Sequence, residues 1–191
     1  MAEQQGLARV PIPERGDLEA EALAFFDELA RRGQPVPNVY RLLCNAPHLG
    51  AAMLQLSDAL RRSVHLPPKL RELVILYTCE VNEAAYELAH HRKGALLAGV
   101  EANQVECVRD FERADCFSAA ERAVLTLARE LSTAPLAVRN ETFRELQAYL
   151  SVPAILELAV TIGWYHLAGR LTATVDLKLE DAMRAGAHSK P

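Results

Sequence analysis

The sequence predicts an all-α protein, and three observations support that prediction. Hydrophobic residues recur with helical spacing from one end of the chain to the other, and no stretch alternates apolar and polar residues as a half-buried strand does. Proline and glycine residues stand between the periodic segments, where they interrupt helices. Half of the 191 residues are hydrophobic and 24% are charged, which is the composition of an ordinary globular domain.

The N-terminal third begins with an irregular arm over residues 1–16, which contains Pro11, Pro13 and Gly16. The hydrophobic spacing then predicts a helix over residues 17–32, which Gly33 and the prolines after it end. Two shorter helices are expected over residues 38–46 and 47–63.

A central pair of helices follows. Pro67 and Pro68 suit the first turn of a helix, where a missing N–H has no helical partner to lose. That helix is expected to continue to Cys79, with one buried face formed by Leu70, Leu73, Val74 and Tyr77. We expect a second helix to begin at Asn82 as its N-cap, to reach Ala98, and to end at Gly99 as the C′ residue.

The C-terminal half predicts four more helices. A short one begins near Ala102, and Ser118 with Glu121 forms a capping box for a helix to Leu131. Residues 140–150 form another, and the last long helix runs from 152 to about 185. The pattern predicts one helical domain over residues 17–185, with a disordered tail over 186–191.

Composition excludes several function classes. The net charge is −4 and no block of basic residues occurs, so a nucleic-acid partner is not expected. No apolar run approaches about 18 residues, and the N-terminus lacks the features of a secretory signal, so we expect a cytoplasmic protein without a membrane span. The four cysteines are scattered without metal-type pairing, and we expect them to be reduced and mostly buried: Cys44, Cys79, Cys107 and Cys116.

Residues 83–91 carry the strongest chemical signal. On one helix, Glu83, Glu87 and His91 share a face, because they are spaced at i, i+4 and i+8. His90 points about 100° away from His91. A carboxylate beside an imidazole is a general acid/base arrangement, although such pairs are also common on solvated helix faces. A metal site formed by the same three residues is an alternative that lacks a visible fourth ligand.

The segments 66–73 (LPPKLREL), 85–91 (AYELAHH) and 98–100 (AGV) closely resemble the core of the carboxymuconolactone decarboxylase and alkylhydroperoxidase D (AhpD) superfamily. The resemblance extends over about residues 38–180, with supporting segments at 38–43, 118–125 and 162–165. It implies an AhpD-like orthogonal helical bundle of about eight or nine helices.

The resemblance also assigns residues. The peroxidase branch carries a Cys-x-x-Cys-x-x-x-His motif, whose histidine matches His91 while its two cysteines match Ala84 and Glu87. A proton-relay glutamate of that branch matches Glu72. The acid/base pair is therefore retained and the dithiol is lost. Cys79 lies on the preceding helix and is not expected to replace it.

The resemblance implies a cofactor-free lyase or isomerase that acts on a small acidic substrate such as a lactone. In the decarboxylase members, loss of CO2 leaves a delocalised carbanion that must be reprotonated. We predict His91, Glu72 and Glu87 as the catalytic residues and Tyr86, Tyr165 and Arg71 as substrate-binding residues. Arg71 or Arg170 is a candidate to hold a substrate carboxylate, and each is alternatively a salt-bridge partner. The segment 164–166 is a candidate to line the pocket, and it is alternatively core or subunit interface.

Two other functions stay open. One is an alkylhydroperoxidase-like antioxidant protein, or its relic, which the loss of both motif cysteines disfavours. The other is a non-catalytic helical oligomer that binds a ligand. In each case we expect no cofactor, no resident metal and a homo-oligomer, with a trimer or hexamer favoured over a dimer.

Overall fold

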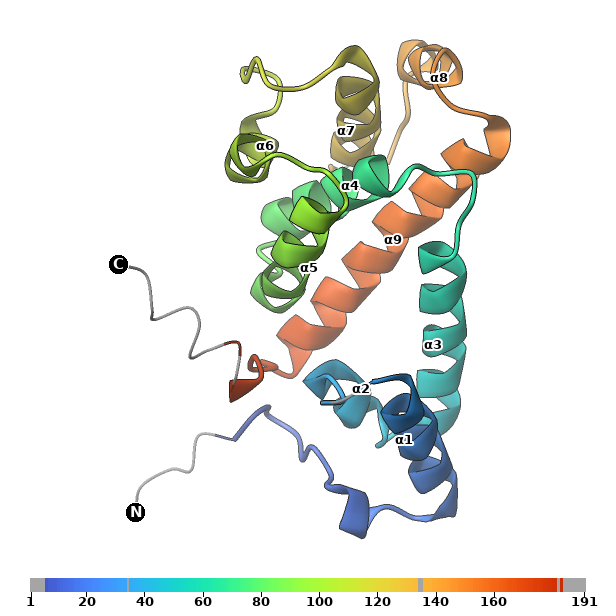
Figure 1. Cartoon of the computed structure of the whole chain (residues 1–191), viewed down its shortest axis with the longest axis vertical. Coiled ribbons are helices and arrows are strands. Elements are labelled where there is room, and N and C mark those ends of the chain that lie inside the picture. The colour runs from blue at the N-terminus through green and yellow to red at the C-terminus, as the bar shows by residue number, and fades with distance from the viewer. Residues whose placement is uncertain (1–5, 34, 134–135, 182, 184–191) are drawn as a thin grey trace. The chain divides into compact units, whose positions relative to one another are not determined.

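The computed structural model describes residues 6–33, 35–133, 136–181 and 183, and the regular elements within these ranges are all helical. The all-α prediction is confirmed (Figure 1). The α-helices are α1 (Ala20–Arg32), α2 (Asn38–Leu43), α3 (Pro47–Arg61), α4 (Pro68–Val81), α5 (Ala85–Leu97), α6 (Ala102–Cys107), α7 (Ala119–Ser132), α8 (Asn140–Gln147) and α9 (Val152–Thr174). Two 3₁₀ turns, Arg15–Asp17 and Val108–Asp110, complete the described elements.

The chain divides into two compact units. Of the described residues, unit 1 holds those up to Arg61 and those from Thr172 onward, and unit 2 holds those from Arg62 to Leu171. Each unit has its own set of internal contacts, so they are described separately below. The prediction of a single domain over residues 17–185 stays a prediction.

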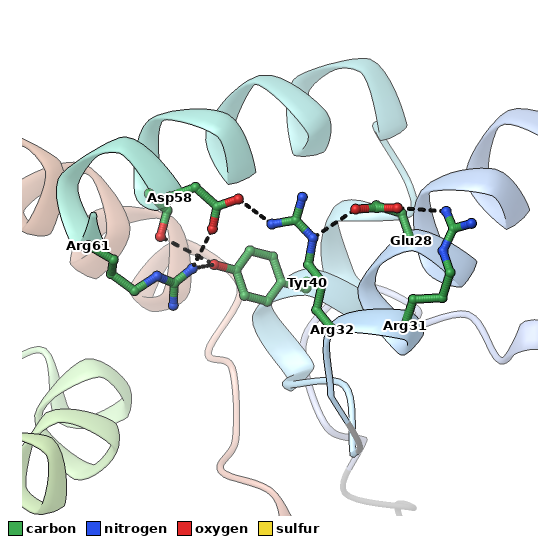
Figure 2. Close-up of polar contacts among 7 residues, drawn as sticks. Glu28, Arg31, Arg32, Tyr40, Asp58 and Arg61 are labelled. Carbon is green, nitrogen blue, oxygen red and sulfur yellow. Dashed lines mark hydrogen bonds and ion pairs between the residues drawn. The ribbon is translucent and has the colours of Figure 1, made fainter. Parts of the chain in front are cut away.

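Unit 1 packs α1, α2 and α3 around a small apolar core that includes Phe25 and Leu29. A glycine is required at position 50, because a Cβ there would lie 2.7 Å from the Phe25 ring. On the outside, Arg32 of α1 joins Glu28 to Asp58 of α3, and Figure 2 shows this network continuing through Arg61 to the Tyr40 hydroxyl. Exposed ion pairs of this kind contribute little each, so the apolar contacts carry most of the stability.

Unit 2 is built around α4. Every residue from 73 to 79 is buried, because α5 packs on one side of α4 and α7 on another (Figure 1). Leu73, Val74 and Tyr77 lie in the core as predicted, and Leu70 is partly buried against it. Helix α9 contributes Leu158 to the same core.

Helix ends in unit 2 follow the predicted signals at three places. Pro68 occupies the first turn of α4, and the Ser118–Glu121 capping box is formed at the start of α7. Gly99 has φ +91°, a left-handed conformation that glycine adopts without steric penalty.

The boundary between α4 and α5 corrects the prediction. Asn82 ends α4 instead of starting α5, and Glu83 adopts a left-handed φ of 54°. The Ala84 N–H then donates to the Cys79 carbonyl at 2.9 Å and closes the end of α4. Non-glycine residues are uncommon in this conformation, so the residue types give no signal for the turn.

The end of α9 is also corrected, because it stops at Thr174 instead of continuing to about residue 185. Asp176 is left-handed with φ 52°, and the Leu177 N–H donates to the Thr172 carbonyl at 3.0 Å. Aspartate tolerates this conformation better than most residues do. The predicted tail over 186–191 lies outside the described residues.

Among the described residues, one helix is long and apolar enough to cross a membrane, and it is α9. That helix also supplies Ala154, Leu158 and Ile162 to the core of unit 2. Some long core helices reach the same length and hydropathy as membrane spans, so these two properties do not decide between the two roles.

Candidate active site

Three helices of unit 2 bring Glu72, His91 and Tyr165 together. Glu72 lies in α4, His91 in α5 and Tyr165 in α9. His91 Nδ1 is 2.9 Å from a Glu72 carboxylate oxygen, and His91 Nε2 is 2.8 Å from the Tyr165 hydroxyl. The three side chains therefore form one continuous hydrogen-bonded chain.

The donors and acceptors of these two hydrogen bonds follow from the chemistry of Glu72 and Tyr165 at the two ends. An ionised carboxylate can only accept, so His91 Nδ1–H donates to Glu72. In the neutral imidazole Nε2 is then an acceptor, and the Tyr165 O–H donates to it. This tautomer is assigned from the hydrogen-bond network. Glu72 thus fixes the tautomer that prepares His91 to take a proton from Tyr165.

The three hydrogen-bonded side chains are partly shielded from water. The exposed side-chain fraction is 12% for Glu72 and 22% for His91, and Tyr165 is buried. The Tyr165 ring meets the His91 ring edge to face at a centroid distance of 4.8 Å. Water can therefore reach the imidazole edge, while the phenol is held in one orientation by packing.

The other predicted catalytic and binding residues lie around this chain. Glu87 is buried in the first turn of α5, but the hydrogen bonds of His91 go to Glu72 and Tyr165. Arg71 is largely buried, and its Nε lies 4.0 Å from the second carboxylate oxygen of Glu72. This ion pair is the alternative that the sequence analysis gave to substrate binding by Arg71. The catalytic role of Glu87 and the substrate role of Arg71 stay predictions.

Tyr86 is placed differently from Tyr165. It is buried, and its ring packs on the His90 ring at 4.7 Å. Because residues 86 and 90 are one turn apart, this contact lies on a different side of α5 from the chain through His91. The two tyrosines among the predicted substrate-binding residues are thus separated, with Tyr165 hydrogen-bonded to the imidazole and Tyr86 against the neighbouring histidine.

Cys79 lies close to the position of the missing thiols. It forms a small buried cluster with Ile75, Ala84 and Tyr165. Burial, together with the nearby carboxylates of Glu87 and Glu72, raises the pKa of Cys79 far above its usual value. A thiol in this environment stays protonated, so it is a poor nucleophile.

The three-residue face that suggested a metal site does not form. Glu83 lies in the left-handed turn before α5, so it does not share a helical face with Glu87 and His91. Within the described residues no group of three or more histidine, cysteine or acidic side chains is arranged to hold a metal ion.

A second polar cluster of unit 2 surrounds His166, one residue after Tyr165. The Asn82 side-chain amide lies 2.8 Å from His166 Nδ1, and the Ser132 hydroxyl lies 2.9 Å from Nε2. Burial and the charge of Arg170 lower the pKa of His166, which favours the neutral ring. A pocket of about 510 Å³ opens beside it, lined by Leu131, Ser132, Thr133, Leu136, Ala159, Ile162, Gly163, His166 and Arg170. Sequence reasoning considered pocket lining for the segment 164–166, but it missed the partners on α7 and at the end of α4.

Comparisons with known proteins agree with this architecture. Residues 47–130 match the carboxymuconolactone decarboxylase family. The debrominase Bmp8, solved as a cysteine-to-alanine variant in complex with 2,3,4-tribromopyrrole, is 27% identical, with a TM-score of 0.76 over 92% of this chain and 94% of that chain.

Two more distant structures share the fold. One is an alkylhydroperoxidase AhpD-core protein, an uncharacterised peroxidase-related protein of Ralstonia eutropha JMP134, with 21% identity and a TM-score of 0.80 over 94% of this chain and 95% of that chain. The other is a peroxidase-related protein of Silicibacter sp. TM1040, with 16% identity and a TM-score of 0.80 over 96% and 97%. No curated protein matches the chain.

Proposed function

We propose that the chain, whose residues 47–130 match the carboxymuconolactone decarboxylase family, is an enzyme of the carboxymuconolactone decarboxylase and AhpD-like superfamily that moves a proton on a small organic substrate. The observation that carries the proposal is the hydrogen-bonded chain from Glu72 through His91 to Tyr165, with links of 2.9 and 2.8 Å. A positioned imidazole between a carboxylate and a phenol is suited to general acid/base catalysis.

The geometry suggests how each residue takes part. Both nitrogens of His91 are occupied, so the phenol at the end of the chain is the group that meets the substrate. When the site acts as a base, Tyr165 takes a proton from the substrate while its own proton passes to His91 Nε2. Glu72 then stabilises the imidazolium that forms. When the site acts as an acid, the same proton travels in the opposite direction.

The family suggests the reaction class. We favour a cofactor-free lyase or isomerase that acts on a small acidic substrate such as a lactone. In a decarboxylation, the carbon–carbon bond to the carboxylate breaks and CO2 leaves. The electron pair of that bond stays on the substrate as a carbanion, which takes the proton that Tyr165 delivers. A second proton enters from solvent through His91, whose edge is partly exposed, and restores the chain.

Thiol-dependent peroxidase chemistry at this site has less support. Alanine and glutamate stand at positions 84 and 87, where the peroxidase branch has its two cysteines. The nearby Cys79 is buried, and its raised pKa keeps it protonated. The pocket beside His166 fits the third possibility, a ligand-binding protein, but ligand binding alone gives no reason for the Glu72–His91–Tyr165 chain.

The test begins with a substrate search in deuterated water. The panel contains lactone carboxylates, β-keto acids and, because of the debrominase relative, a bromopyrrole. NMR detects loss of substrate and transfer of deuterium to carbon, and released CO2 is measured separately.

His91→Gln is then compared with His90→Gln on any substrate found. Glutamine keeps a polar side chain and removes the titrating group, so His91→Gln should lower kcat about 10²- to 10⁴-fold. His90→Gln is the matched control, because its ring packs on Tyr86 outside the hydrogen-bonded chain. Wild-type turnover in His91→Gln, or equal losses in both variants, would show that the reaction does not depend on the Glu72–His91–Tyr165 chain.

A further inference from the structure

A pair of cysteines in unit 2 lies where α6 ends. Cys107 is the last residue of α6, and Cys116 lies in the loop before α7. Their sulfur atoms are 3.2 Å apart although both cysteines are reduced. The scattered positions of the cysteines in the sequence gave no indication of this contact.

The exposure of this pair distinguishes it from the other cysteines. Cys107 and Cys116 are each partly exposed, whereas Cys44 and Cys79 are buried at 4% and 0% exposure. A disulfide needs two sulfurs that approach each other and a path for the molecule that oxidises them. Among the four cysteines, the two that meet are also the two that solvent reaches.

We propose that Cys107 and Cys116 form a dithiol site that undergoes reversible thiol–disulfide exchange with small disulfides. The thiolate of one cysteine attacks a sulfur of the small disulfide, which forms a mixed disulfide and releases one thiol. The second cysteine then attacks the protein sulfur of the mixed disulfide, closes the Cys107–Cys116 bond and releases the second thiol. The protein loses two protons and two electrons, and the small disulfide gains both.

The surroundings assign a different part to each sulfur. The Cys107 thiol donates to the Asn103 carbonyl at 2.8 Å within α6. Burial and the neighbouring Cys116 raise the pKa of Cys107 to about 11. The hydrogen bond to the Asn103 carbonyl occupies the Cys107 thiol, so we assign the first attack to Cys116. The resolving step is short, because the two sulfurs are already in contact.

Closing the bond needs little movement of the backbone. A disulfide bond is about 2.05 Å long, so the sulfurs must approach by roughly 1 Å. The Cys116 carbonyl is fixed by a 2.8 Å hydrogen bond from Gln104, which also donates to Glu121 of α7 at 3.1 Å. Oxidation would therefore tie the end of α6 to a loop that is already anchored, and it should stabilise the fold.

The test uses the full-length protein in buffers of reduced and oxidised glutathione. After acid quenching and denaturation, the wild type should titrate four thiols when reduced and two when oxidised. Its intact mass should fall by the mass of two hydrogen atoms, and excess reduced glutathione should reverse both changes.

Trypsin then locates the bond. It cleaves after Arg109 and Arg113, so peptides 94–109 and 114–122 separate in the reduced protein and stay joined in the oxidised one. Oxidation should raise Tm by about 5 °C, as expected for a crosslink that closes a short loop. Cys107→Ser and Cys116→Ser should each lose the joined peptides and the rise in Tm, and Cys44→Ala should keep both.

Three results would overturn the proposal. The first is a wild type that keeps four titratable thiols in oxidised glutathione. The second is a disulfide that joins two copies of the chain, and the third is one that involves Cys44 or Cys79. These measurements use the wild-type protein itself, so they remain decisive even where a serine variant does not fold. They also stand apart from the proton-transfer site, because none of its three hydrogen-bonded residues is a cysteine.

Discussion

Replacing Tyr165 by phenylalanine separates the two ways in which the site can deliver a proton. The substitution keeps the ring that packs edge to face on His91 at 4.8 Å, and it removes only the hydroxyl. If the phenol meets the substrate, this variant should lose as much activity as His91→Gln. If His91 reaches the substrate directly, Tyr165→Phe should keep most of the activity.

The two expected effects differ in size. The lost hydrogen bond contributes about 0.5–1.5 kcal/mol to stability. Water can replace the hydroxyl in part, because the His91 side chain is 22% exposed. Removing a general acid or base should lower kcat about 10²- to 10⁴-fold. That loss corresponds to about 2.7–5.5 kcal/mol of activation free energy, so it exceeds the loss of stability.

The assay measures kcat by NMR and Tm by calorimetry on the same preparations. Tyr77→Phe is the matched control, because Tyr77 is also buried in unit 2 but packs on Phe111 in the core. We expect kcat to fall in Tyr165→Phe and to stay near wild type in Tyr77→Phe. Wild-type kcat in Tyr165→Phe, with His91→Gln inactive, would show that the imidazole acts on the substrate without the phenol.

Three more predictions concern redox chemistry, assembly and acid stability. Because Ala84 and Glu87 stand where the peroxidase branch has its two cysteines, hydroperoxide reduction at this site should be negligible in a coupled peroxidase assay. Hydroperoxide turnover that persists after all four cysteines are replaced by serine would contradict our account of the site. We expect a trimer or hexamer by light scattering, since Leu156 and Val160 are exposed on α9, and a monomer near 21 kDa would overturn this. Burial opposes ionisation of Glu121, but Lys69 at 2.7 Å holds its pKa below the usual value. The resulting stability is present above about pH 4.3 and is lost as the pH falls through the lower folded pKa. Glu121→Gln should therefore lower the free energy of unfolding by about 1.5–3 kcal/mol at neutral pH and by less in acid, whereas an equal deficit at both pH values would contradict this linkage.

Much of the fold could be predicted because its signals are local. Hydrophobic spacing, Pro68, Gly99 and the Ser118–Glu121 capping box each act within one or two helical turns, and the structure confirms them. The ends that were misplaced depend on left-handed turns at Glu83 and Asp176. Neither residue type demands that conformation, so the turns follow from how the adjoining segments pack.

The site shows the same division between local and distant information. The sequence placed Glu87 one helical turn before His91 and so made it the nearest carboxylate along the helix. The imidazole instead binds Glu72 of α4, 19 residues earlier in the chain, and Tyr165 of α9, 74 residues later. The family resemblance supplied Glu72, because a motif preserves a spatial relation that one helix cannot reveal.

Tyr165 was expected only to bind substrate, and its contact with His91 Nε2 adds proton transfer to the roles that this residue can have. A phenol that only binds substrate needs no partner behind it, whereas a phenol that transfers a proton needs a base within hydrogen-bond reach. At 2.8 Å, His91 is such a base, and Glu72 at 2.9 Å stabilises the charge that it would acquire. In the proposed mechanism, substrate binding and proton transfer meet at this one hydroxyl, so the Tyr165→Phe variant tests the mechanism more sharply than a change at His91 alone.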